Sequence, residues 1–134
     1  MMFTSITLRY IGEKLSIDSI STSLGVLPTA SGSSGDSVKS TSGKERVLKA
    51  GFWEWSIKAE SDQINQINDQ IESFGSVFNK VLDKLGSQLG CSHSWIDIHI
   101  IEDAENFPVS LPINSKSMSI LSKAGLLIDL TISN

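Results

Sequence analysis

Four segments of the sequence alternate apolar and polar residues with a period of two, and this pattern constrains the fold more than any other feature. The segments lie near residues 3–10, 46–58, 94–101 and 126–133. A period of two places successive side chains on opposite faces of a β-strand. The pattern therefore predicts four strands, each with one apolar face.

The same alternation predicts which side of the sheet is buried. The apolar positions are Ile6, Leu8, Tyr10, Trp53, Trp55, Ile57, Ile96, Ile98, Ile100, Ile128, Leu130 and Ile132. The opposite, polar face is expected to carry Thr7, Arg9, Glu54, Lys58, Asp97, His99, Asp129 and Thr131. Two large aromatic residues, Phe52 and Trp95, also fall on the polar face. They either lie under a loop or anchor a partner.

Helical spacing of apolar residues appears between the strand segments. One helix is expected to begin at Ser16 and a later one at Asn114 or Ser115, residue types that cap helix N-termini. Each ends at a glycine that suits a C-terminal cap, Gly25 and Gly125. A longer run is expected to start at Ser61 or Asp62. This run indicates either two consecutive helices or one helix bent at Gly75.

This order of elements predicts an α+β fold. We expect a two-layer sandwich in which helices pack on one face of an antiparallel or mixed sheet of four to five strands. The length of 134 residues suits a single domain spanning residues 1–134. Residues 29–43 are dominated by Ser, Gly and Thr, which offer little apolar area for burial, and we expect this segment to be a flexible loop.

Four motifs carry a resemblance to a known family. They are ITLRYIG at 6–12, LGVLPT at 24–29, AGFWEW at 50–55 and AGLLID at 124–129. Together they resemble the small bacterial family called domain of unknown function 4279. The resemblance spans nearly the whole chain but departs from the family pattern in the Ser-rich segment. It implies a fold and brings no catalytic residues, while the presence of similar small acidic proteins among bacterial immunity proteins implies a protective binding role.

Composition and charge argue against a nucleic-acid partner. The chain has 11 Lys and Arg residues against 15 Asp and Glu, which gives a net charge of −4. This balance weakens the long-range attraction to phosphate on which nucleic-acid binding depends. A local basic group, made of Lys39, Lys44, Arg46 and Lys49, lacks the interleaved aromatic residues of a single-strand binder. We therefore expect the chain to favour basic protein surfaces.

Other sequence features predict a cytoplasmic protein without a membrane partner. No apolar stretch reaches the length that spans a bilayer. Residues 1–10 lack the basic flank and apolar run of a signal peptide. The only cysteine, Cys91, cannot form an internal disulfide.

Two groups of residues could carry chemistry, and neither matches a catalytic pattern. The first is the set of carboxylate and imidazole groups on the polar face: Glu54, Asp97, His99 and Asp129. A flat strand face seldom makes such groups converge as metal binding or hydrolysis requires. The second is Cys91 with His93, which lacks a third, orienting group in the local sequence. No phosphate-binding loop is present. We expect no catalytic residues, no metal and no cofactor.

The remaining hypothesis is protein binding through acidic surfaces. The candidate partner-binding residues are Phe52, Glu54, Asp97, His99, Glu102, Asp103, Glu105 and Asp129. A cognate, basic toxin domain is the expected partner, because acidic inhibitors gain association rate through electrostatic steering. The alternatives are a small-molecule-binding or enzymatic domain, which would use the open sheet face or a pocket under the Ser-rich segment, and a self-associating structural domain. The sequence leaves the oligomeric state open.

Overall fold

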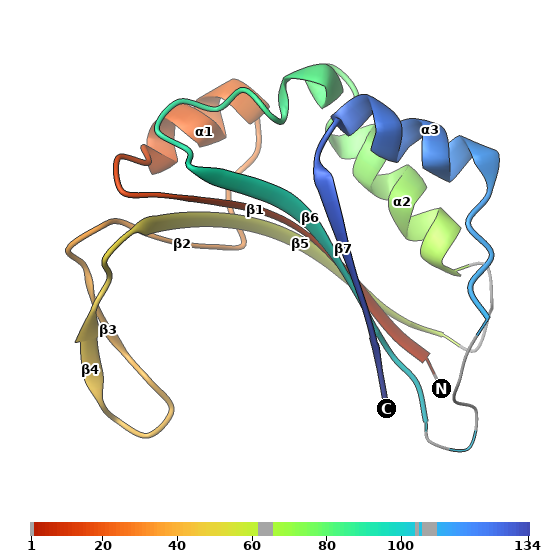
Figure 1. The fold of residues 1–134 in the computed structure, drawn as a ribbon, viewed down its shortest axis with the longest axis horizontal. Coiled ribbons are helices and arrows are strands. Elements are labelled where there is room, and N and C mark those ends of the chain that lie inside the picture. Colours follow the sequence, from red (N-terminus) through yellow and green to blue (C-terminus); the bar gives the residue numbers. More distant parts are fainter. Residues whose placement is uncertain (1, 62–65, 104, 106–109) are drawn as a thin grey trace.

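A curved five-stranded sheet forms the centre of the molecule (Figure 1). The structure is a computed structural model that describes residues 2–61, 66–103, 105 and 110–134. The strand order is β2-β5-β1-β6-β7. The strands are β1 (Met2–Gly12), β2 (Ala30–Gly32), β5 (Gly51–Ser61), β6 (His93–Ile101) and β7 (Leu127–Ser133). β7 runs parallel to β6 and every other neighbouring pair is antiparallel, so the sheet is mixed.

The helices lie on one face of this sheet, which confirms the predicted two-layer α+β fold (Figure 1). They are α1 (Ile17–Leu24), α2 (Gln66–Val77), the 3-10 turn η1 (Leu82–Lys84) and α3 (Ser115–Ala124). In the part of the chain that the structure describes, no helix has the length and apolar character needed to cross a membrane.

Local capping chemistry defines the ends of α1 and α3 as predicted. The Ser16 side chain accepts a hydrogen bond from the Ser19 amide at 3.3 Å, and α1 ends at Gly25 with φ +74°. The Asn114 side chain accepts from an amide of the first turn of α3 at 2.8 Å, and α3 ends at Gly125 with φ +65°. Side-chain acceptors satisfy amides that a helix cannot pair internally.

The central helical run forms two consecutive segments, α2 and η1, and α2 continues through Gly75 without ending there. A Cβ atom at Gly75 would lie 3.0 Å from side-chain atoms of Ile120 in α3. The glycine therefore permits close packing of two helices. Of the two predicted alternatives, the structure has two consecutive helical segments. Of the two predicted capping residues, Ser61 ends β5 and Asp62 lies outside the described residues.

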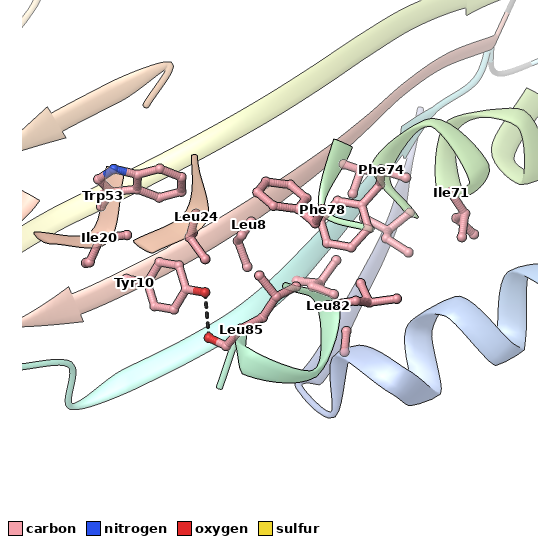
Figure 2. Close-up of a cluster of buried hydrophobic side chains, with 14 of the residues drawn as sticks. Leu8, Tyr10, Ile20, Leu24, Trp53, Ile71, Phe74, Phe78, Leu82 and Leu85 are labelled. Carbon is pink, nitrogen blue, oxygen red and sulfur yellow. Dashed lines mark hydrogen bonds between the residues drawn. The ribbon is translucent and has the colours of Figure 1, made fainter. Parts of the chain in front are cut away.

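The hydrophobic core fills the space between sheet and helices and confirms the predicted faces of β1, β5 and β6. Figure 2 shows Tyr10 beside Leu85 and Trp53 beside the α1 side chains Ile20 and Leu24, with the rings of Phe74 and Phe78 farther along the core. The Tyr10 and Trp53 rings meet edge to face with centroids 5.7 Å apart. The Tyr10 hydroxyl donates a hydrogen bond to the main-chain oxygen of Leu85 at 2.5 Å.

Two strand predictions require correction in the first half of the chain. Residues 46–58 form part of two strands, β4 (Glu45–Val47) and β5, rather than one. Residues 29–43 contain β2 and β3 (Ser37–Lys39), and β3 pairs with β4 in a separate hairpin. Backbone hydrogen bonds build this hairpin, including Gly43 N to Ser40 O at 2.9 Å. Gly43 has φ +82°, which suits glycine, so turn chemistry specifies the hairpin without any apolar alternation. The flexibility of the segment stays a prediction.

The predicted burial of β7 is also wrong. Ile128, Leu130 and Ile132 lie in register with Ile96, Ile98 and Ile100 of β6, yet they remain 37%, 47% and 36% exposed. β7 is the edge strand, and on the helix side the core buries Ile96, Ile98 and Ile100 of its neighbour β6 but leaves the corresponding β7 side chains partly exposed. The alternation of β7 predicted correctly which side chains lie on the helix side. It did not predict their burial, because burial depends on how far the helices cover the sheet.

Tyr10→Phe is expected to lower the free energy of unfolding by about 1–2 kcal/mol at neutral pH, because the buried Leu85 oxygen loses its donor. Burial, with a smaller contribution from Cys91, raises the pKa of the Tyr10 phenol above its ordinary value of 10.0. Above pH 10 the unfolded chain releases this proton while the folded chain retains it, so the contribution falls as pH rises. Urea unfolding of both proteins from pH 7 upward should show their difference shrinking above pH 10. A constant difference would contradict the prediction.

Candidate functional site

The face of the sheet opposite the helices, which we call the open face, brings together five of the eight predicted site residues. The strand pairings place them on this face: Phe52, Glu54, Asp97, His99 and Asp129. Figure 1 shows the sheet curving away from the helices, so that the open face lies on its hollow side. The predicted polar face therefore exists as one continuous surface.

The β3–β4 hairpin, which we call the arm, stands at one end of the open face (Figure 1). A pocket of about 700 Å³ lies where the arm joins the sheet. Its walls are formed by Ile11, Arg46, Val47, Leu48, Lys49, Ala50, Gly51, Phe52 and Glu54. A second hollow of about 320 Å³ shares Ile11 and continues across the face to Trp95 and Leu127. The two hollows make this end of the open face a recessed, largely apolar surface.

Glycine at position 32 shapes the wall of the larger pocket. A Cβ atom at Gly32 would lie 2.7 Å from Leu48 and 2.8 Å from the Phe52 ring. Both side chains therefore close over β2, and Phe52 is partly covered at the base of the arm. Trp95 lies on β6, two strands away from Phe52 on β5, and it is also partly buried. The two aromatic residues flank β1 from either side.

Arg9 lies at the centre of the open face and contacts two of the predicted acidic residues. Its guanidinium forms an ion pair with Glu54 on β5, and its Nε lies 3.3 Å from Oδ2 of Asp97 on β6. All three side chains are roughly a quarter to a third exposed. The positive charge of Arg9 offsets part of the negative charge of Glu54 and Asp97. The centre of the open face is therefore a mixed-charge cluster rather than the acidic surface that the sequence predicted.

The other three predicted residues, Glu102, Asp103 and Glu105, lie beyond the C-terminal end of β6. β6 begins beside Ile11 and the pockets and ends beside Phe3, so this acidic loop occupies the opposite end of the sheet. The Glu102 carboxylate accepts a hydrogen bond from the Asp103 amide at 2.9 Å. The structure thus divides the predicted site into two separate surfaces.

The histidine and cysteine side chains near the sheet each have a nearby hydrogen-bond partner. His99 Nε2 lies 3.1 Å from the Ser133 hydroxyl at the end of β7. The Cys91 thiol donates to the main-chain oxygen of His93 at 3.0 Å, and burial raises its pKa. The His93 ring contacts Ser92, its own neighbour. Within the described ranges, no group of three or more His, Cys, Asp and Glu side chains could hold a metal ion.

The fold and the open face define a small α+β domain in which one side of the sheet is covered by helices and the other is recessed beside a hairpin arm. The chain belongs to the family described as Domain of unknown function (DUF4279), which matches residues 2–134. The resemblance carried by the four sequence motifs is therefore confirmed. Comparisons with curated proteins and with solved structures found no match.

The sequence indicated Arg46 and Lys49 only as part of a local basic group, with a pocket under the Ser-rich segment as an alternative. It did not predict that Arg46, Leu48 and Lys49 line a recess of the open face, because they come from the arm and its junction with β5, whose strand pairing has no apolar alternation. Arg9 was placed on the correct face, but its contacts depend on β1 lying between β5 and β6. One signal for an apolar patch was present in the sequence. Ile11 occupies the next position on the polar face of β1, but it is apolar.

Proposed function

We propose that this chain is a non-catalytic protein-binding domain, and that it neutralises a basic bacterial toxin domain by occluding the active site of that toxin. The open face is the proposed binding surface. The observation that carries this proposal is the recessed apolar end of the face, where Phe52 lies opposite Ile11, Trp95 lies opposite Arg9, and the charged cluster around Arg9 adjoins them. Partly buried aromatic residues beside charged groups are typical of protein interfaces.

The form of the recess favours a protein partner. The two hollows adjoin at Ile11 and extend over four strands of the sheet, from β5 to β7, and Leu127 at the border is 69% exposed. Such a surface accommodates several side chains of a loop or strand from another protein. The chemistry at Cys91 supports a non-catalytic role, because its thiol donates to a main-chain oxygen and burial raises its pKa, which disfavours the thiolate that a nucleophilic cysteine needs.

A small-molecule ligand is the second candidate function, and one observation favours it. The larger pocket, at about 700 Å³, has a volume within the usual range of ligand sites, which is roughly 300–1,000 Å³. Arg46 and Lys49 would provide positive charge for an anionic group, and Phe52 an apolar wall. Equilibrium dialysis against a cell metabolite extract would distinguish this function from protein binding.

The direct test of the proposal uses the products of adjacent genes. Purified chain should capture one neighbouring gene product as a one-to-one complex, and co-expression should restore growth to cells that express that product. The complex should also block the activity of the toxin in a purified assay. Failure to capture any neighbouring product, together with no growth rescue, would refute the toxin-binding proposal.

Electrostatic steering should appear in the association rate. Replacing Glu102, Asp103 and Glu105 together with lysine is expected to slow association about tenfold at low salt, with a smaller effect at high salt. A matched control carries the same charge change on the helix side, at the exposed residues Asp18, Asp69 and Asp83. Stopped-flow kinetics at several salt concentrations measures both. Equal slowing by the two variants would mean that net charge, not the acidic loop, steers the partner.

A further inference from the structure

The outer edge of β7 has no strand beside it in the described part of the chain. The strand is seven residues long and contains neither proline nor lysine, and its one charged residue is Asp129. Edge strands in soluble proteins are usually protected by lysine, proline, a bulge or a covering segment, because unpaired backbone groups invite another strand. β7 lacks the protection that its own sequence could supply.

An apolar strip on the helix side of β7 also lacks a cover. Ile128, Leu130 and Ile132 are each more than a third exposed, although their neighbours on β6 are at most 1% exposed. The strip therefore continues the apolar face of β6 onto the edge strand, where the side chains are less buried. Exposed apolar residues that adjoin an unpaired edge are typical of an interaction surface.

We propose that a second copy of this chain pairs with β7, antiparallel, about a twofold axis at Leu130. Leu130 is the midpoint of Leu127–Ser133, so this register pairs every residue of the strand. On the helix side, Leu130 meets Leu130 of the second copy and Ile128 meets Ile132 of the second copy. The apolar strip is symmetric about its centre, which is what an interface between identical surfaces requires.

Charge on the other side of the strand favours the same register. An axis at Leu130 places Asp129 opposite Thr131 of the second copy, on both sides of the axis. Shifting the axis by one residue to Asp129 would place two carboxylates directly opposite each other, which is destabilising. The strand sequence therefore selects one register by apolar matching and by avoidance of like charges.

The dimer is compatible with the open face. A twofold axis perpendicular to the sheet keeps both helix layers on one side and both open faces on the other. Two five-stranded sheets then become one continuous sheet, and the backbone groups of the two edges pair with each other. This inference does not depend on the proposed toxin partner and is tested without it.

The first test measures mass by light scattering over a range of concentrations. The wild-type chain should have twice its monomer mass of 14.5 kDa. Thr131→Glu places a carboxylate opposite Asp129 at two sites and should raise the dissociation constant about tenfold. Thr131→Lys places an ammonium group there and should retain or tighten the dimer. Thr22→Glu and Thr22→Lys on the exposed surface of α1 are matched controls without effect.

The second test examines the register by cross-linking. In a Cys91→Ser background, Leu130→Cys should form a disulfide-linked dimer on mild oxidation. Directly paired antiparallel residues have Cα atoms roughly 4.5–5.5 Å apart, within the range of about 4.4–6.8 Å that disulfides need. Asp129→Cys is the control and should cross-link poorly, because it faces Thr131. A monomer at all concentrations, a dimer that responds equally to Glu and Lys at position 131, or equal cross-linking of both cysteine variants would each overturn the proposal.

Discussion

Trp53→Ala is expected to lower the free energy of unfolding by about 3–5 kcal/mol, the usual cost of truncating a large core aromatic residue. Trp53 is fully buried on β5, next to the central strand. Its ring packs edge to face against Tyr10, and its Nε1 donates to the Ser21 hydroxyl of α1 at 3.0 Å. Alanine removes both contacts and leaves a cavity where α1 meets the sheet.

Chemical unfolding followed by circular dichroism measures this loss. Trp95→Ala is the matched control, since it removes the same side chain from the open face, where Trp95 is only partly buried. We expect the control to cost less than half as much as Trp53→Ala. Equal losses would mean that both faces of the sheet contribute equally to the core.

The alternation of β1, β5 and β6 predicted the faces of the sheet because it is a local property of each strand. Trp53 and Glu54 are neighbours in sequence and point to opposite sides, so a single strand assignment places both. The ends of α1 and α3 were predictable for the same reason, since Ser16 and Asn114 bond to amides three residues ahead. Such interactions need no knowledge of the rest of the fold.

The features that the sequence did not predict depend on segments distant in the chain. Ile128 and Ile96 carry the same pattern, yet helices cover one and not the other. The pairing of Arg9 with Glu54 and Asp97 follows from strand order, which alternation does not encode. Strand order and helix coverage arise only when the whole chain is packed.

The candidate site shows the same division. Alternation correctly placed Phe52, Glu54 and Asp97 on one surface, but it did not show that the acidic loop lies at the other end of the sheet. The recess depends on the arm, whose hairpin is specified by glycine and by main-chain hydrogen bonds rather than by apolar periodicity. The sequence therefore predicted the surface chemistry better than its shape.

Trp95→Ala, and separately Phe52→Ala, should reduce affinity for the proposed toxin partner by at least about 30-fold, which corresponds to the 2 kcal/mol typical of an interface hot spot. Each residue lines one of the two hollows, so each loses an anchor that a partner would bury. The loss should appear mainly as faster dissociation, because the overall charge is unchanged. This distinguishes the aromatic anchors from the acidic loop, whose reversal should act on association.

Surface plasmon resonance with the captured partner measures both rates. Met118→Ala is the control, because it removes an exposed apolar side chain from α3 on the helix side and should leave affinity unchanged. Wild-type affinity in both aromatic variants, combined with slowed association in the acidic-loop variant, would move the interface to the far end of β6. The expected outcome is that Trp95→Ala weakens binding while Trp53→Ala mainly weakens folding. The two tryptophans would then have separate roles because they lie on opposite faces of one sheet: Trp95 faces a partner, and Trp53 faces the core.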